Sequence, residues 1–192
     1  MQTLQLAIEV ISNIDTDQFA PAVEAMHNCK GRIICTGVGK SGHIARKTAA
    51  TIASIAKPCH FVHATEASHG DLGCVSSDDI CIAFSHSGNT PELAGILEHC
   101  AWLNVPVIAI TSNKQSILGK AAKHAIIYPN LSEAWANAPT TSTTAQIVIG
   151  DALAVMLAEK LGKTASDFYQ NHPGGQIGKQ KELNHVTQKN RQ

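Results

Sequence analysis

Short apolar runs that alternate with helical patterns constrain the fold of this chain more than any other feature. Most of these runs are rich in Ile and Val and have no polar residue at every second position, which is typical of parallel strands buried on both faces. The predicted strands are Arg32 to Thr36, Cys59 to His63, Asp79 to Phe84, Pro106 to Thr111 and His124 to Tyr128. The helices predicted between them are Gly42 to Ile55, Pro91 to Leu103 and Ser116 to Ala122. The fold class is therefore predicted as α/β, a doubly wound, five-stranded parallel sheet flanked by helices.

Helical patterns also precede and follow the predicted sheet. Apolar residues between positions 3 and 27 are spaced as in one or two helices, with a break near Asn13 to Asp17, so we expect an N-terminal helical extension over residues 1–30. An irregular segment after the fifth strand leads into a long apolar helix from Ala145 to Leu161. One domain is expected over residues 31–178, followed by a polar tail over residues 179–192.

The overall charge is balanced, with 15 Lys and Arg against 15 Asp and Glu. Because only the last residues are locally basic, we expect neither nucleic acid nor a membrane surface as a partner, and a small ligand instead. The chain shows no N-terminal signal pattern and no apolar run of about twenty residues, so a cytoplasmic location is expected. The six cysteines form no Cys-x-x-Cys pair and are interpreted as reduced thiols of the core.

The stretch from Phe84 to Leu93 is interpreted as the end of a strand, a hydroxyl-rich turn and the start of a helix. Its turn carries three hydroxyl groups within six residues, on Ser85, Ser87 and Thr90. Free amide groups at a helix N-terminus, together with hydroxyl groups, form a cradle for an anion such as a phosphate. The alternative is that the hydroxyl groups only cap the helix, for which one would suffice.

A glutamate follows directly in the same helical turn. A carboxylate at a helix N-terminus complements the helix dipole, but beside a bound phosphate it would be repelled by the ligand. Glu92 is therefore either a simple complement to the dipole or a base placed against a phosphorylated substrate.

The glycine-rich turn after the first strand allows two further interpretations. Residues 37–42, Gly-Val-Gly-Lys-Ser-Gly, match the G-x-G-x-x-G pattern, but no acidic residue stands where a dinucleotide ribose would need one. A P-loop is excluded because Ile34 occupies the position of its first glycine. What remains is a turn that presents Lys40 and Ser41 to the cleft, or a packing turn with a solvated lysine.

Other candidate residues lie in two turns and at one helix start. The run from Thr140 to Thr144 opens the last long helix and is expected to face the same cleft. His69 and His172 stand next to glycine-rich turns, where side chains tend to be presented to ligands. No histidine and cysteine spacing typical of zinc appears, so neither a metal site nor a cofactor is expected from the residues alone.

These motifs together resemble the sugar isomerase (SIS) domain family, and within it the arabinose 5-phosphate isomerases, from about Gly31 to Gly178. The segments that carry the resemblance are residues 37–42, residues 66–73 (Glu-Ala-Ser-His-Gly-Asp-Leu-Gly), residues 85–92, residues 138–145, residues 150–154 and residues 172–175 (His-Pro-Gly-Gly). The resemblance implies an enzyme that interconverts D-ribulose 5-phosphate and D-arabinose 5-phosphate without a cofactor, usually for synthesis of the lipopolysaccharide sugar Kdo. It also implies a homo-oligomer, a tetramer in this family.

The resemblance assigns roles to particular residues. Catalytic roles fall on Lys40, Glu92, Glu133 and His172. Substrate contacts fall on Ser41, His69, Ser85, His86, Ser87, Gly88, Asn89, Thr90, Thr140 and Ser142. His63 matches a position where the family can bind an inhibitory zinc ion.

The chain departs from the family pattern in two respects. Asn89 and Thr90 stand where these isomerases commonly have Glu and Ser, and the usual pair of regulatory CBS domains is expected to be absent. The competing functions are a phosphosugar-binding regulator without chemistry and another SIS sugar-phosphate isomerase. Whether Glu92 or a histidine is the base, and which pathway uses the product, stay open at this point.

Overall fold

The sheet of this protein contains five parallel strands in the order β2-β1-β3-β4-β5, as described by a computed structural model for residues 1–175. The strands are β1 (Ile33–Gly37), β2 (Cys59–His63), β3 (Ile80–Phe84), β4 (Val107–Thr111) and β5 (His124–Ile127). Each strand begins and ends within one residue of its predicted range. The ends of the predicted domain and the tail, residues 176–192, lie outside the described part of the chain.

The helices are α1 (Gln2–Ser12), α2 (Phe19–Asn28), α3 (Gly39–Ile55), α4 (Ala64–Ala67), α5 (Ala94–Leu103), α6 (Ile117–Ala121), α7 (Thr141–Lys160) and α8 (Ala165–Asn171). Three short 3-10 turns are η1 (Thr16–Gln18), η2 (Asp71–Cys74) and η3 (Pro91–Leu93). The predicted N-terminal helices are confirmed, with their break at η1. Three helical turns were not expected, namely α4, η2 and α8.

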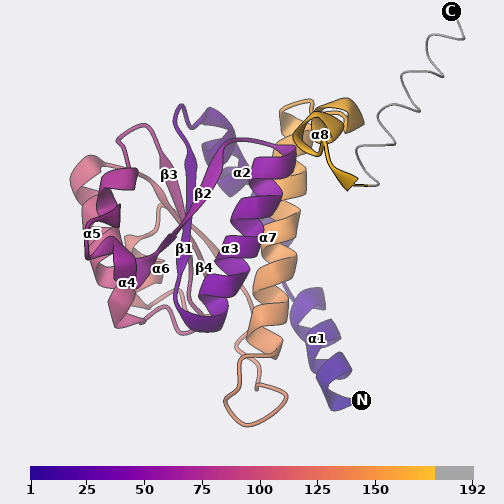
Figure 1. The fold of residues 1–192 in the computed structure, drawn as a ribbon. Helices are drawn as coiled ribbons and strands as arrows, with labels where there is room; N and C mark the ends of the chain where they lie inside the picture. Colours follow the sequence, from indigo (N-terminus) through magenta and orange to yellow (C-terminus); the bar gives the residue numbers. More distant parts are fainter. Residues whose placement is uncertain (176–192) are drawn as a thin grey trace, which may run out of the picture.

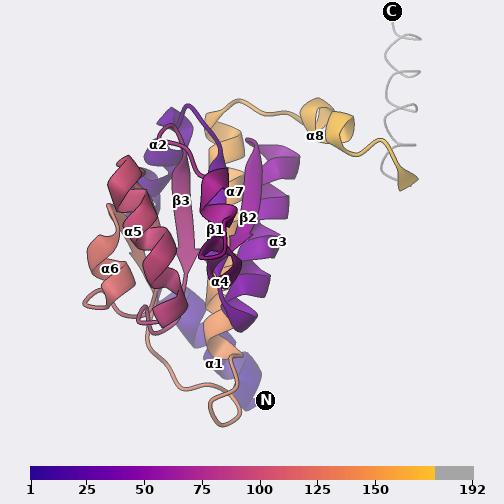
Figure 2. The ribbon, with the colours of Figure 1, turned by 60° about the vertical axis from the view of Figure 1, so that its left-hand side comes forward.

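Helices cover both faces of the sheet (Figures 1 and 2), and a hydrophobic cluster lies on each face. Ile33, Ile82 and Ile108 point to the face covered by α2, α3 and α7, whereas Ile34 and Ala83 point to the face covered by α4, α5 and α6. Alternate side chains of the fully buried strands therefore pack into two different cores. This explains the continuous apolar runs in the sequence. The predicted doubly wound fold is confirmed.

Helix α7 carries apolar residues on several sides, since Ile149 and Leu153 are buried while Val148 and Val155 are exposed. It packs along α3, and α1 lies against its N-terminal half (Figure 1). Among the described residues, α7 is the one helix long and apolar enough to cross a membrane, and half of its most apolar stretch is buried inside the domain. It is therefore a core helix, and the cytoplasmic location stays a prediction.

All six cysteines are free thiols, and four of them are buried. The Sγ atoms of Cys35 and Cys59 lie 3.7 Å apart between neighbouring strands, and that contact together with burial raises the pKa of Cys35. These thiols behave as small apolar side chains, as predicted, although Cys74 is exposed.

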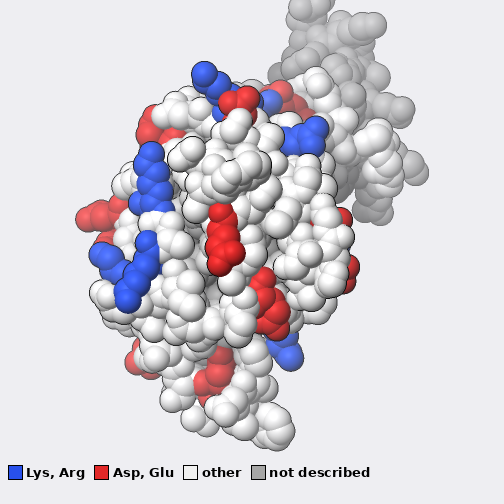
Figure 3. Space-filling model, turned by 90° about the vertical axis from the view of Figure 1, so that its left-hand side faces the viewer, with Lys and Arg blue, Asp and Glu red and all other residues white. Residues whose placement is uncertain are grey.

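The face that carries α4 and α5 bears charged side chains in small separate groups (Figure 3). Basic and acidic residues both occur on it, and neither sign forms a broad patch there. The expectation that nucleic acid is not a partner stays a prediction.

Candidate active site

The candidate site lies at the ends of β1 and β3, where the chain leads to helices on opposite faces of the sheet. Strands β1 and β3 are hydrogen-bonded neighbours, and Gly37 at the end of β1 pairs with Phe84 at the end of β3. The helix after β1 covers one face, and the helix after β3 covers the other, so the two connections diverge at this point. In sheets of this strand order, ligands bind in the crevice between two such diverging connections.

The turn after β3, which we call the serine loop (residues 85–90), is held together by its own hydroxyl groups. Ser85 is 3% exposed, and its Oγ lies 2.8 Å from Thr90 Oγ1 and accepts a hydrogen bond from the Gly88 amide at 3.0 Å. Ser87 is exposed, and its Oγ accepts from the Asn89 amide at 3.2 Å. Ser85 and Thr90 therefore shape the loop, while Ser87 presents its hydroxyl to solvent.

The serine loop is also fastened to α6. Gly88 has a φ of +69°, and a Cβ atom built on it would lie 2.0 Å from Ser116 Oγ. The Asn89 side chain accepts a hydrogen bond from the Ile117 amide at 3.0 Å, and the Gly88 carbonyl accepts one from the Leu118 amide at 2.9 Å. Asn89 thus helps to fasten the loop to α6, and its contact with substrate stays a prediction.

Two side chains of opposite charge lie in the connections that form the crevice, and neither has an ion-pair partner in the described chain. Lys40 lies in the first turn of α3 and Glu92 lies in η3, and both are exposed. Neither forms an ion pair within residues 1–175. Ser41 follows Lys40 and is half-buried in the same turn. The first turn of α3, the serine loop and η3 thus present an ammonium group, hydroxyl groups and a carboxylate at one edge of the sheet.

His69 lies in the turn that follows α4. This turn adjoins the start of α5, because Ser68 Oγ would be 3.0 Å from a Cβ atom on Gly95. Helix α4 also packs against η3, which contains Glu92. The exposed His69 therefore lies in a segment next to the one that carries Glu92, as its predicted substrate contact requires.

Glu133 is bound to the N-terminus of α7. Its Oε2 accepts hydrogen bonds from the Thr140 amide at 2.7 Å, from Thr140 Oγ1 at 3.0 Å and from the Ser142 amide at 3.3 Å. Burial raises the pKa of this carboxyl group, but the hydrogen bonds from Ser142 and Thr140 outweigh it, so the pKa lies below its usual value. Thr140 and Ser142, which were predicted to contact substrate, hold this carboxylate.

A buried polar chain that sequence reasoning missed supports His86. Tyr128, just after β5, is 1% exposed, and its hydroxyl lies 3.2 Å from His86 Nδ1 and accepts a hydrogen bond from Gln146 Nε2 at 3.0 Å. The two rings stack with centroids 5.8 Å apart. The sequence signal for such a chain was Gln146, a polar residue next to an apolar stretch of α7. It is fully buried, and a buried amide needs hydrogen-bond partners.

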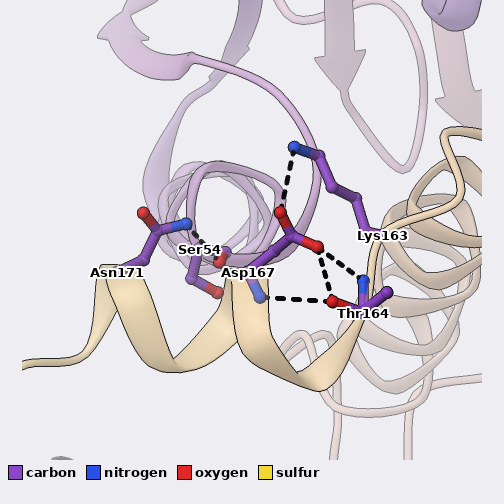
Figure 4. A network of polar contacts seen from close by, with 5 residues as sticks. All are labelled: Ser54, Lys163, Thr164, Asp167 and Asn171. Carbon is purple, nitrogen blue, oxygen red and sulfur yellow. Dashed lines mark hydrogen bonds and ion pairs between the residues drawn. The ribbon is translucent and has the colours of Figure 1, made fainter.

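His172 lies away from the other candidates. It follows α8, which is tied to the last turn of α3 by a hydrogen bond of 2.9 Å from Asn171 Nδ2 to the Ser54 carbonyl (Figure 4). A capping box between Thr164 and Asp167 closes the start of α8. Since Lys40 is in the first turn of α3, about 20 Å of helix separates the two ends. A single chain therefore does not bring His172 to the crevice.

The predicted zinc position at His63 gains no further ligands. The Nδ1 atom of His63 accepts a hydrogen bond from the Thr65 amide at 3.3 Å and so caps α4. Within the part of the chain that the structure describes, no three His, Cys, Asp or Glu side chains gather as a metal site would require. The zinc site stays a prediction.

A cavity of about 580 Å³ opens at the opposite, amino-terminal edge of the sheet. Its lining includes Lys30, Asp78, Asp79, Pro106 and Lys123. None of the predicted site residues lines it, so the site described above is defined by the switch point and not by this cavity.

The family model for the SIS domain matches residues 26–156 of this chain. This range contains both connections that form the crevice. The chain belongs to the SIS domain family. The predicted family is thereby confirmed, and the crevice lies inside the matched SIS domain.

Several curated proteins are similar in sequence to this SIS domain. It is 43% identical over 183 residues to arabinose 5-phosphate isomerase KdsD of Escherichia coli K12, covering 93% of this chain and 56% of that protein. It is 45% identical over 165 residues to the KdsD protein of Pseudomonas aeruginosa, covering 85% of this chain and 51% of that protein. The chain thus spans about half the length of these curated relatives.

One solved structure has the same fold as this chain over nearly its whole length. The protein c3406 of Escherichia coli CFT073, solved in complex with arabinose 5-phosphate, has a TM-score of 0.84 and 38% identity to this SIS domain. The similarity covers 90% of this chain and 92% of that chain. At this level of identity, the common ancestry extends to the whole domain and not only to the motifs.

Proposed function

We propose that this SIS domain is an aldose-ketose isomerase that interconverts D-ribulose 5-phosphate and D-arabinose 5-phosphate. The observation that carries the proposal is the switch point, where Lys40, Ser87 and Glu92 are exposed at one edge of the sheet. Neither Lys40 nor Glu92 forms an ion pair within residues 1–175. The similarity to KdsD proteins supports this substrate pair, as does the complex of c3406 with arabinose 5-phosphate.

The chemistry requires a proton to move between two neighbouring carbon atoms. From the aldose, a base removes the C2 proton, and the carbonyl oxygen on C1 takes a proton, which gives an enediol. Loss of the proton from the C2 oxygen and protonation of C1 then give the ketose. The reaction needs no redox partner, because the bond changes balance within the sugar.

The residues at the crevice fit this chemistry. The serine loop, with Ser87 and the amides of the following turn, would hold the phosphate. Glu92, which no cation of the described chain neutralises, would act as the base, and the ammonium group of Lys40 would stabilise negative charge on the sugar oxygens. His69 is the alternative base, because its segment adjoins that of Glu92. Glu133, anchored on α7, would orient neighbouring groups.

The decisive experiment incubates the purified protein with ribulose 5-phosphate and follows the aldose product. Conversion, with no conversion of hexulose phosphates, is expected. Absence of conversion with retained sugar-phosphate binding would instead support the phosphosugar-binding regulator. Conversion of a different ketose phosphate would support another isomerase of the family.

We further propose that the working form is an oligomer, a tetramer as in the family, in which His172 completes the site of another copy. Large apolar side chains are uncovered on α1 and α7, with Leu4 65%, Ile8 66% and Val155 48% exposed. Apolar side chains left uncovered on two packed helices support an interface with another protein chain. Helices α1 and α8 both lie on the side of the sheet that carries α7 (Figure 1).

Mixing two inactive variants tests this arrangement. Lys40→Met and His172→Ala should each be inactive alone, and co-expression should restore activity, because some sites then combine an intact Lys40 with an intact His172 from another copy. Light scattering should show the same oligomeric state for both. A monomer, or an oligomer without restored activity, would contradict the proposal.

A further inference from the structure

Neighbouring groups hold both the backbone and the ring of His86, a residue of the serine loop. Its carbonyl oxygen accepts hydrogen bonds from Ser112 Oγ at 2.8 Å, from Thr111 Oγ1 at 3.0 Å and from the Ser112 amide at 3.0 Å. Its Nδ1 lies 3.2 Å from the Tyr128 hydroxyl, and its ring stacks on the Tyr128 ring. Backbone and ring are therefore both fixed before any ligand arrives.

The direction of the hydrogen bonds follows from the number of hydrogens available. Gln146 Nε2 donates to the Tyr128 oxygen, which leaves the single phenolic hydrogen for another acceptor. Tyr128 is 1% exposed, so an unused phenolic hydrogen would be buried without a partner, at a cost in stability. The acceptor within reach is His86 Nδ1. The imidazole therefore carries its hydrogen on Nε2.

The opposite orientation of the Gln146 amide is less favourable. As described, the amide leaves one buried acceptor, Oε1, without a partner. A flipped amide would instead place its NH₂ group at that buried position, where it would need acceptors, and proteins leave buried N–H groups unpaired more rarely than carbonyl oxygens. Burial also raises the pKa of Tyr128, so the phenol keeps its hydrogen and remains a donor.

The other ring nitrogen of His86 is available to a ligand. Within residues 1–175 it has no hydrogen-bond partner, and it is not among the buried polar atoms that lack one. His86 belongs to the serine loop, whose hydroxyl groups and turn amides form the candidate phosphate cradle. An N–H group at Nε2 can donate a hydrogen bond to a phosphate oxygen held by this loop.

We propose that Gln146 and Tyr128 are positioning residues that fix His86 with its hydrogen on Nε2, so that the imidazole donates a hydrogen bond to the phosphate group of the substrate. The class of ligand rests on the proposed function. The tautomer does not, because it follows from the buried chain alone.

Nuclear magnetic resonance of protein labelled with ¹⁵N-histidine tests the tautomer directly. At mildly alkaline pH, where histidines are neutral, a mobile imidazole shows averaged nitrogen shifts because it exchanges between tautomers. His86, assigned by its loss in His86→Leu, should show an unaveraged hydrogen-bearing Nε2 in the wild-type protein. A hydrogen on Nδ1, or averaged shifts, would overturn the proposal.

Kinetics with ribulose 5-phosphate test the contact. Tyr128→Phe keeps the ring and removes the hydroxyl, so it should raise KM about tenfold and leave kcat nearly unchanged. His86→Leu should raise KM at least as much, and the double variant should be no worse than His86→Leu alone, because both changes remove the same contact. His86→Gln, which keeps an amide donor, should lose less than His86→Leu.

Thr48→Val is the matched control, since it removes a buried hydroxyl that has no partner and lies between α3 and α7. It should leave KM unchanged. An unchanged KM in Tyr128→Phe, or a fall in kcat alone, would overturn the contact to phosphate. If the wild-type protein converts no ribulose 5-phosphate, the proposed function fails separately, and titration with inorganic phosphate and arabinose 5-phosphate still decides whether the His86 Nε2 signal responds.

Discussion

Two lysines at the ends of α3 show how differently the two edges of this sheet use charge. Lys57, just after the helix, donates hydrogen bonds to the carbonyl oxygens of Met26, His27 and Cys29 at 3.1, 3.0 and 2.5 Å. Lys40, in the first turn, is exposed and has no ion pair within the described residues. Lys57 thus holds the fold at the amino-terminal edge, while Lys40 at the carboxyl-terminal edge is available to a ligand.

Carboxylates follow the same division with one exception. Asp79 at the amino-terminal edge accepts hydrogen bonds from the amides of Arg32 at 2.6 Å and Ser76 at 2.8 Å. Glu92 at the other edge has no such partner among the described residues. Glu133, near the same edge, accepts hydrogen bonds from the amides of Thr140 and Ser142 at the start of α7. Glu92 is therefore a candidate for chemistry because its charge has no partner among the described residues, whereas Asp79 and Glu133 bind backbone amides.

The largest effect is expected from Glu92→Gln. Removing a general base should lower kcat about 100-fold to 10,000-fold, while binding of the sugar phosphate is largely kept. Turnover of ribulose 5-phosphate measures this, and Glu98→Gln, an exposed glutamate of α5, is the control with unchanged activity. Near-normal turnover of Glu92→Gln would move the role of base to a histidine.

The two lysines provide the next comparison. Lys40→Met should lower kcat about 100-fold or more, with an unchanged free energy of unfolding, because it removes stabilisation of a developing oxyanion. Lys57→Met should lower the free energy of unfolding by about 2 kcal/mol, because three carbonyl groups lose a charged donor, while kcat of the folded protein is kept. Urea titrations and turnover on both variants measure this. A stability loss in Lys40→Met would show that the first turn of α3 is structural.

Two glycines with positive φ, Gly88 in the serine loop and Gly39 at the start of α3, should differ in their tolerance of a side chain. Gly88→Ala should lower the free energy of unfolding by about 2 to 4 kcal/mol, because the added Cβ meets Ser116 and the backbone stays left-handed. Gly39→Ala, with a φ of +57° and no atom within 4 Å of the new Cβ, should cost only about 1 kcal/mol. Thermal unfolding of the two variants compares them. Equal losses would mean that strain alone, and not contact with α6, shapes the loop.

The smallest effect concerns Glu133. Its pKa is lower in the folded than in the unfolded protein, so its contribution to stability is present above the unfolded value of about 4.3 and is lost as the pH falls through the folded value. Glu133→Ala should therefore lower the free energy of unfolding by about 1 kcal/mol at neutral pH, and by progressively less in acid. Urea titrations at several pH values measure the difference. A difference that grows in acid would reverse the assigned direction.

The sequence was sufficient for the sheet, because buried parallel strands need continuous apolar runs and their helices need apolar stripes. It also located the serine loop and Lys40, since a turn between strand and helix is marked by glycine and hydroxyl residues. It could not separate Ser87 from Ser85 or Asn89, because whether a polar side chain is free depends on its neighbours. Asn89 is bonded to Ile117, which lies 28 positions away in the chain.

By itself, then, the sequence determined the fold class, the family and the edge of the sheet where chemistry is expected. Only the tertiary structure decided that Thr140 and Ser142 hold Glu133, that His172 lies at the far end of α3, and that Tyr128 and Gln146 support His86. The physical reason is range. Apolar periodicity and turn residues act locally along the chain, whereas a hydrogen bond assigns its donor and acceptor only after folding has brought distant segments together.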